Sequence, residues 1–148
     1  MRFLLIDDIL ELVPGDHIRA TKTLSPAEEL FEDHFPGFAV VPGVLLVEMM
    51  AQAAGRCLAA EDTGRGWPML AKITSAGFRE WVRPGDGCMI EARIRSSRAQ
   101  FATAECRVEV SGRLVAESSL LFSFVPRDRF AAEWRDDVLD RFMKNAGG

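Results

Sequence analysis

Residues 34–55 read HFPGFAVVPGVLLVEMMAQAAG, and the last twelve of them decide the fold. Among those twelve residues only Glu48 and Gln52 have polar side chains. The proline-glycine pair before them is typical of a helix start, and we expect one helix from Pro42 to about Ala60. A helix that is apolar nearly all round is buried on most of its sides. Some other part of the chain must therefore wrap around it.

The second half of the chain has the pattern of this wrapping element. Apolar and polar residues alternate over residues 88–95, 102–110 and 114–125. A period of two, with short turns between the runs, predicts antiparallel strands that bury one face. A further strand is expected over residues 69–82, with Gly77 as a candidate β-bulge.

The N-terminal part predicts two more strands. They cover residues 3–13 and about 18–24, on either side of a Pro-Gly-Asp turn at residues 14–16. Ser25, followed by a proline and two glutamates, is typical of the start of a short helix. Together these patterns predict an α+β fold in which a twisted antiparallel sheet of five to six strands wraps around a long central helix.

The last part of the chain has the periodicity of another helix. Over residues 128–144 apolar side chains recur every four positions, which predicts an amphipathic helix that packs on the sheet or on a partner subunit. We therefore expect one domain over residues 1–127, with residues 128–148 as its C-terminal helical extension. The apolar side chains of this expected helix are Phe130, Trp134, Val138 and Phe142.

Composition and charge argue against several classes of function. The net charge is −4 and no basic run appears, which disfavours nucleic-acid binding. No stretch approaches the ~20 apolar residues of a membrane-spanning helix. Three cysteines without metal-like spacing cannot all pair, which favours core positions and a reducing, cytoplasmic compartment. They are Cys57, Cys88 and Cys106. We expect neither a metal nor a cofactor.

His34 and Glu48 are the candidate base and acid. A histidine titrates near neutrality and can remove a weakly acidic proton. A glutamate in an apolar helix has its protonated form favoured by desolvation, so it can donate a proton near neutral pH. Two alternatives stay open: His34 as a loop residue with a structural hydrogen bond, and Glu48 as a carboxylate that reaches a buried arginine. The other histidine, His17, is expected in a solvated turn.

Four further residues near this pair are candidates for the site. Gly43 stands at the helix start, where the first N–H groups lack partners and a carbonyl oxygen can approach closely, although Pro-Gly pairs also merely shape turns. Gln52 lies one turn after Glu48, where it orients the carboxyl group or satisfies a buried backbone group. Phe35 and Phe38 line an apolar tunnel or pack in the core.

The pattern HFPGx4PGVLxxExMAQ, from His34 to Gln52, resembles the signature of the β-hydroxyacyl-acyl-carrier-protein dehydratases of bacterial fatty-acid synthesis. Weaker similarity extends from Phe3 to about Val125. The resemblance implies a hotdog fold and at least a homodimer, or a hexamer made of three such dimers. It also implies a site across the dimer interface, with the histidine from one protomer and the carboxylate from the other.

The resemblance further implies the roles of individual residues. His34 would take a C2 proton from a 3-hydroxyacyl thioester, and the Gly43 N–H group would polarise the thioester carbonyl. Glu48 would protonate the departing C3 hydroxyl group, which gives water and a trans-2-enoyl thioester without any cofactor. Glutamate at this position resembles the branch of the family without isomerase activity. The substrate-binding positions would be Phe35, Phe38, Val44 and Gln52.

The partner implied by the resemblance is an acyl carrier protein, or coenzyme A, that bears the acyl group as a thioester. Because the carrier protein is acidic, it would dock on a basic patch. Two alternatives are a hotdog acyl-thioesterase, in which the glutamate activates water, and a non-catalytic acyl-binding subunit. Asp33 and Ala39 replace a glycine and a proline that are usual in the family, and the chain has no tyrosine, which favours a specialised pathway. Candidates for the basic patch are Lys72, Arg79, Arg83 and Arg98.

Overall fold

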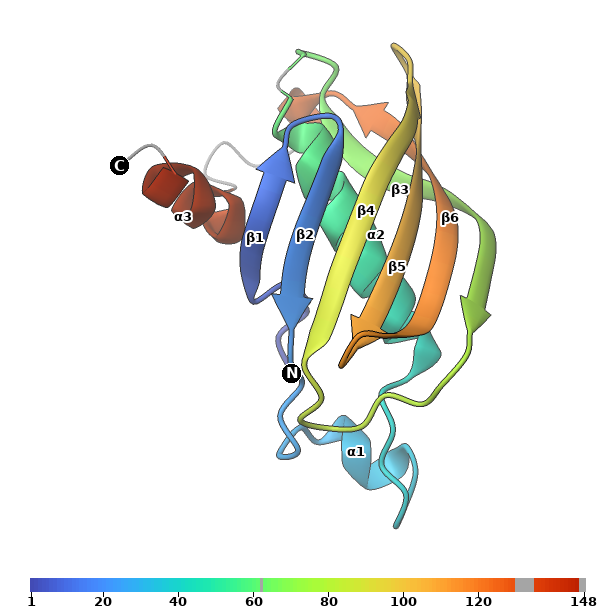
Figure 1. Cartoon of the computed structure of the whole chain (residues 1–148). Helices are drawn as coiled ribbons and strands as arrows, with labels where there is room; N and C mark the ends of the chain where they lie inside the picture. The colour runs from blue at the N-terminus through green and yellow to red at the C-terminus, as the bar shows by residue number, and fades with distance from the viewer. Residues whose placement is uncertain (62, 130–134, 147–148) are drawn as a thin grey trace.

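The centre of the structure is an antiparallel sheet that curves around one long helix (Figure 1). The structure, a computed structural model, describes residues 1–61, 63–129 and 135–146. The six strands lie in the order β1-β2-β4-β5-β6-β3, so β1 and β3 form the two edges. The strands are β1 (Asp8–Val13), β2 (His17–Lys22), β3 (Trp67–Phe78), β4 (Cys88–Ser97), β5 (Phe101–Val110) and β6 (Arg113–Val125).

The long helix, α2 (Gly43–Ala59), packs against the inner face of this sheet. Its sheet-facing side chains are fully buried and meet apolar side chains from the inner faces of the strands. Each such large side chain contributes roughly 1.5–3 kcal/mol of stability when it leaves water. The predicted sheet around a central helix is therefore confirmed. Examples from the helix are Met49, Met50 and Ala53, and examples from the strands are Ile90, Val108 and Leu120.

The three cysteines belong to this core. All three are buried, and burial raises the pKa of the Cys57 thiol to about 11 and of the Cys88 and Cys106 thiols to about 12. The thiols therefore stay protonated and unreactive near neutral pH. The prediction that they occupy core positions is confirmed.

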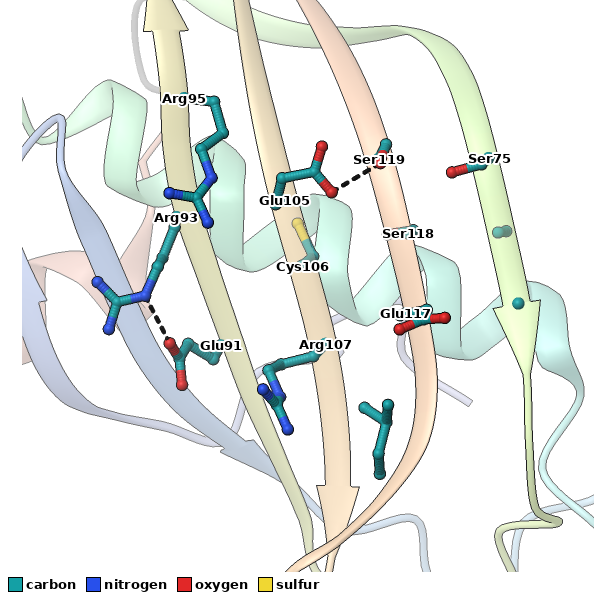
Figure 2. A pocket seen from close by; sticks show the side chains of 13 residues that line it. Ser75, Glu91, Arg93, Arg95, Glu105, Cys106, Arg107, Glu117, Ser118 and Ser119 are labelled. Atoms are coloured by element: carbon teal, nitrogen blue, oxygen red, sulfur yellow. Dashed lines mark hydrogen bonds and ion pairs between the residues drawn. The ribbon is translucent and has the colours of Figure 1, made fainter.

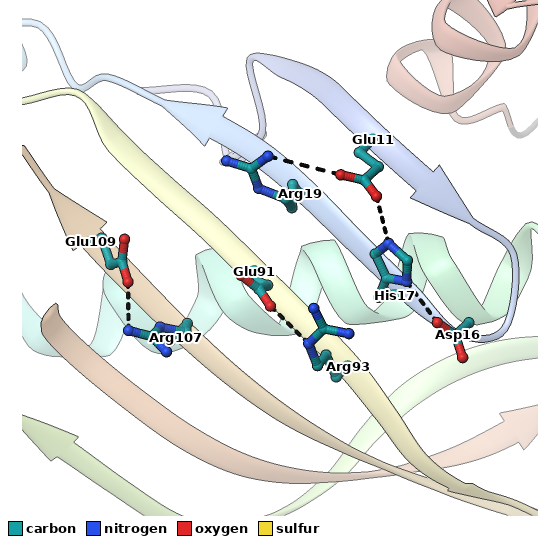
Figure 3. A network of polar contacts seen from close by, with 8 residues as sticks. All are labelled: Glu11, Asp16, His17, Arg19, Glu91, Arg93, Arg107 and Glu109. Atoms are coloured by element: carbon teal, nitrogen blue, oxygen red, sulfur yellow. Dashed lines mark hydrogen bonds and ion pairs between the residues drawn. The ribbon is translucent and has the colours of Figure 1, made fainter. Parts of the chain in front are cut away.

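The outer face of the sheet is polar, as the period of two in the sequence predicts. Ion pairs lie on it along single strands, such as Glu91–Arg93 on β4 and Arg107–Glu109 on β5 (Figure 3). His17 belongs to this face, and the prediction of a solvated turn is wrong. It is the first residue of β2, and its ring nitrogens lie 2.6 Å from Asp16 Oδ2 and 2.7 Å from Glu11 Oε1.

The N-terminal segment differs from the prediction. The first strand begins at Asp8, and the residues before it leave the sheet to lie over α2, where the Leu5 N–H group donates to Gln52 Oε1 over 2.9 Å. The helix predicted to start at Ser25 is also wrong, because residues 25–29 form a turn, in which the Ser25 hydroxyl group accepts from the Ala27 N–H group. The short helix α1 (Leu30–Asp33) follows instead.

Strand β3 also has other bounds and other bulges than expected. It begins two residues earlier than predicted and ends at Phe78. Val82, which was expected at the end of this strand, lies outside the sheet, and its carbonyl accepts from the Val41 N–H group over 2.7 Å. The expected bulge at Gly77 is wrong, because Gly77 pairs in register with Glu117. The register shifts lie between residues 70 and 72 and between residues 73 and 75.

The C-terminal part forms the 3-10 helix η1 (Arg127–Arg129) and the α-helix α3 (Asp137–Ala146). The helix is thus shorter than predicted, and Phe130 and Trp134 lie outside the described residues. Helix α3 lies beside β1 (Figure 1), where Val138 is buried. The separation of a domain over residues 1–127 from an extension stays a prediction. Within the described ranges, no helix is long and apolar enough to cross a membrane.

Candidate active site

His34 ends helix α1, and a single hydrogen bond fixes its imidazole ring. Its Nδ1 atom lies 2.9 Å from the Val40 carbonyl oxygen. Because a carbonyl oxygen only accepts, Nδ1 carries the hydrogen, and Nε2 of the neutral ring has a free lone pair. Among the described residues no group bonds to Nε2. The structural hydrogen bond that the sequence left as an alternative is therefore present, and it prepares the other nitrogen to accept a proton.

The loop after His34 is closed on itself by hydrogen bonds. The N–H groups of Phe35 and Phe38 donate to each other's carbonyls, over 2.9 and 2.8 Å, and the peptide bond between His34 and Phe35 is cis. The Val40 N–H group donates back to the His34 carbonyl over 3.1 Å. These bonds hold the imidazole on a defined backbone.

Glu48 lies half-buried on α2, and Gln52 orients it. The Gln52 amide Nε2 donates to Glu48 Oε1 over 3.2 Å and to the Phe3 carbonyl over 3.0 Å, while its Oε1 accepts from the Leu5 N–H group. Both roles predicted for Gln52 therefore occur together. In the described part of the chain Glu48 makes no ion pair, so the alternative of a carboxylate that reaches a buried arginine is not seen.

Gly43 is the first residue of α2, and its N–H group has no hydrogen-bond partner within the described residues. A Cβ atom at this position would lie 2.9 Å from Cε1 of Phe78, closer than real side chains approach. The glycine is therefore needed for the phenyl ring to pack against the helix start. The N–H group at the positive end of the helix can bind an oxygen with partial negative charge.

Aromatic side chains surround this end of the molecule. Phe35 is 51% exposed and stacks on the His34 ring with centroids 4.0 Å apart, so the core-packing alternative for it is wrong. Phe38 meets the edge of Trp81 at 4.9 Å and lies under the Arg83 guanidinium group at 4.8 Å. Val44 is 75% exposed on the first turn of α2. Within the residues that the structure describes, nothing covers the Phe35 and Val44 side chains.

A cavity of about 180 Å³ lies beside Glu48, between α2 and the first residues of β3. Glu48, Gln52 and Arg56 line it from one stripe of the helix, since residues four apart share a face. His34 does not line it, and no hydrogen bond or ion pair joins His34 to Glu48 within the described chain. The other lining residues are Ala51, Gly55, Trp67, Pro68, Met69, Leu70 and Phe122.

A larger hollow of about 580 Å³ opens on the outer face of the sheet (Figure 2). Its charged side chains point toward one another, and several are already paired, as in Glu91–Arg93 and in the hydrogen bond from Ser119 to Glu105. It lies on the opposite side of the sheet from α2 and is not the candidate site. No group of three potential metal ligands occurs in the part of the chain that the structure describes.

Comparisons with known proteins identify the family of the chain. The sequence model of the FabA-like domain family matches residues 1–119. The 3-hydroxyacyl-acyl-carrier-protein dehydratase FabZ of Ruminiclostridium cellulolyticum is 38% identical over 122 residues, which cover 82% of this chain and 86% of that protein.

Solved structures show the same fold at low sequence identity. The dehydratase heterocomplex ApeI:P from Xenorhabdus doucetiae aligns with a TM-score of 0.69 at 17% identity, over 85% of this chain and 86% of that one. A hypothetical thioesterase with coenzyme A from Streptococcus pneumoniae aligns with a TM-score of 0.64 at 11% identity, over 80% and 85% of the two chains. The predicted hotdog fold is confirmed, and the fold alone does not separate dehydration from hydrolysis.

Proposed function

The chain belongs to the FabA-like domain family, and we propose that His34 and Glu48 are the two proton-transfer groups of a 3-hydroxyacyl-acyl-carrier-protein dehydratase. Such an enzyme is a hydro-lyase of fatty-acid synthesis, which removes water from a 3-hydroxyacyl thioester. The observation that carries the proposal is the pair of prepared groups: an imidazole with a free Nε2 atom and a carboxyl group held by Gln52.

The geometry supports the following reaction. Nε2 of His34 takes a proton from C2, and the electrons of the C–H bond form the double bond between C2 and C3. The bond between C3 and its oxygen breaks, and the Glu48 carboxyl group supplies a proton so that water leaves. Before the next turnover the proton gained by His34 has to return to Glu48.

Gly43 has a supporting role in this proposal. While the C2 proton leaves, negative charge gathers on the thioester carbonyl oxygen. The unpartnered Gly43 N–H group at the start of α2 is a preorganised donor for that oxygen, and such donors are worth about 10²–10³ in rate. Phe35, Phe38 and Val44 would line the apolar path of the acyl chain, because their side chains are exposed beside the histidine and the helix start.

We propose that a homodimer completes the site. Strand β3 is an uncovered edge of twelve residues, and an exposed edge is a template for pairing with another chain. A second copy paired along β3 would place His34 of one protomer beside Glu48 of its partner, which accounts for their separation within one chain. A hexamer of three such dimers stays a prediction. The exposed apolar side chains of the strand are Met69, Leu70, Ile73 and Phe78.

We propose that the acyl group arrives on acyl carrier protein and docks at the Phe78 end of β3. A hollow of about 560 Å³ lies there, lined by Phe78, Trp81, Glu80 and three arginines. Glu80 pairs with Arg113, and the remaining positive charge suits an acidic partner. Arg79 and Arg83 belong to it, whereas Arg98 lies in the hairpin after β4, at the Trp67 end of the sheet. Relative rates with carrier-protein and coenzyme A thioesters would distinguish the two carriers. The cytoplasmic location stays a prediction that the three free thiols support.

The direct test is the conversion of a 3-hydroxybutyryl thioester to the enoyl thioester. His34→Ala and Glu48→Gln should each lower the rate by about 10²–10⁴-fold, while His17→Gln, a change at the other histidine, should leave it unchanged. Normal turnover by both site variants would disprove the assignment. Release of free thiol without enoyl product would instead identify a thioesterase.

A further inference from the structure

The cavity beside Glu48 reaches a largely buried charge. Glu48, Gln52 and Arg56 line it at intervals of four residues along α2. At a rise of 1.5 Å per residue, Glu48 and Arg56 are about 12 Å apart along the helix axis. The cavity therefore runs along the helix, and its lining includes both the proposed acid and a guanidinium group.

The guanidinium group is fixed in place by the C-terminal segment. Arg56 Nε donates to Asp136 Oδ1 over 3.2 Å and forms an ion pair with Oδ2 at 3.1 Å, and Nη1 donates to the Gln52 carbonyl over 3.3 Å. The side chains of Arg56 and Asp136 are only 12% and 6% exposed. Asp136 Oδ1 also accepts the Leu139 N–H group at the start of α3, so the ion pair ties this helix to α2.

We propose that the Arg56–Asp136 ion pair is the floor of the acyl-binding cavity and limits the substrates to short and medium acyl chains. This rests on the proposed function of Glu48. A methylene that leaves water for an apolar site improves affinity about fourfold. A methylene that instead contacts a buried ion pair adds no affinity, because it would have to displace polar contacts of the two charged groups.

The length of the cavity gives the limit. An extended chain covers about 3.6 Å per three bonds, as in a polypeptide, or about 1.2 Å per bond. The axial distance from Glu48 to Arg56 thus holds at most about ten bonds beyond C3. A dodecanoyl chain, with nine bonds beyond C3, is the longest even-numbered chain that fits in this length, whereas a palmitoyl chain, with thirteen, does not.

The segment that fixes the arginine lies outside the region matched to the family. Asp136 lies beyond residue 119, where the match to the family model ends. Such a segment changes the chain-length preference without any change in the reacting groups.

The test measures binding of saturated acyl-coenzyme A thioesters from butyryl to palmitoyl by calorimetry, because these ligands lack the 3-hydroxyl group and are not dehydrated. For the wild type, affinity should rise with each methylene up to about dodecanoyl and then level off. A rise that continues to palmitoyl in the wild type would overturn the proposal, whatever the variants do.

The matched variants locate the limit at the ion pair. In Arg56→Met/Asp136→Asn both charges are removed together, which avoids a lone buried charge and keeps an oxygen at the start of α3. The ratio of palmitoyl to butyryl affinity should rise at least about sixteenfold, which is the gain from two methylenes. Arg141→Met, which removes another tie of α3 to β1 without touching the cavity, should leave the ratio unchanged.

Two outcomes separate this inference from the proposed function. An unchanged ratio in the double variant, or an equal rise in Arg141→Met, would overturn the inference while 3-hydroxybutyryl dehydration continues. Absence of dehydration, with the binding series as expected, would overturn the proposed reaction and leave the cavity floor in place.

Discussion

The two edges of the sheet differ in length and cover. Strand β1 has six residues, and α3 lies beside it, with Arg141 donating to the Asp7 carbonyl over 2.7 Å. Strand β3 has twelve residues and a row of exposed apolar side chains. Gly43 and the cavity beside Glu48 both adjoin β3. Within the described residues the chain thus covers one edge by itself and leaves the edge beside the candidate site open, and this open edge is where we propose that a second copy pairs.

The largest expected effect comes from the introduction of a charged residue into an edge strand, because such a charge should prevent pairing of that edge with a second copy. Ile73 on β3 and Leu10 on β1 are similarly exposed, at 47% and 51%. Ile73→Asp should weaken dimerisation by at least about 10²-fold, since a buried unpaired charge costs roughly 3–5 kcal/mol, and dehydration should fall with it. Light scattering with the enzymatic rate at several protein concentrations measures both.

Leu10→Asp is the matched control. Leu10 lies at the register shift of β1 between Ile9 and Glu11, and bulges are common at edges that do not pair further. This variant should remain dimeric and active. If both variants dissociate, or neither does, the result would contradict the proposal that the dimer forms along β3 and not along β1.

The next effect concerns the glycine at the start of α2. In Gly43→Ala the new methyl group would meet the Phe78 ring at 2.9 Å, so the ring must move out of the β3 edge. Overpacking typically costs about 1–3 kcal/mol of folding stability, so the Tm should fall. We also expect kcat/KM to fall, because the ring and the helix start that carries the Gly43 N–H group would shift. Gly77→Ala is the control, because its methyl group would meet only Glu117 at 3.7 Å. Equal rates for the two variants would remove the argument for a close approach at Gly43.

The smallest effect lies on the closed side of the sheet. Hydrogen bonds to Asp16 and then to Glu11 raise the pKa of His17, and the bond from His17 lowers the pKa of Glu11 (Figure 3). The stability due to the imidazolium is complete below the unfolded pKa of about 6.5 and is lost as pH rises through the higher folded pKa. The contribution of Glu11 is lost as pH falls through its lowered pKa. The Tm difference between wild type and His17→Gln should therefore be largest near pH 6 and shrink toward alkaline pH. A Tm difference that does not change with pH would contradict a stabilising role of the hydrogen bonds from His17 to Asp16 and Glu11.

The parts of the fold that the sequence predicted are those with a local signal. Alternation over residues 88–125 identified β4, β5 and β6, and the apolar run after Gly43 identified α2. The course of residues 3–5 depends on hydrogen bonds to Gln52, forty-seven and forty-nine positions away, and no local periodicity encodes such a contact. Their apolar character therefore suggested a strand.

In the candidate site, too, the sequence identified the residues with a local pattern but not the long-range contacts that position them. The spacing from His34 to Gln52 marked the residues, but the free Nε2 atom depends on which backbone carbonyl Nδ1 meets, which only the folded loop determines. Arg56 was not identified, although its position eight residues after Glu48 puts it on the same helix stripe. Its partner Asp136 is eighty positions away and carries no pattern of its own.

The central claim is that each site takes His34 from one protomer and Glu48 from its partner. The most direct test mixes the inactive variants His34→Ala and Glu48→Gln under conditions that exchange subunits. A heterodimer of the two then contains one intact site, so random exchange at equal amounts should restore about a quarter of wild-type dehydration, as expected for a two-fold dimer. Activity no higher than the sum of the separate variants, in a mixture shown to contain heterodimers, would contradict a shared site.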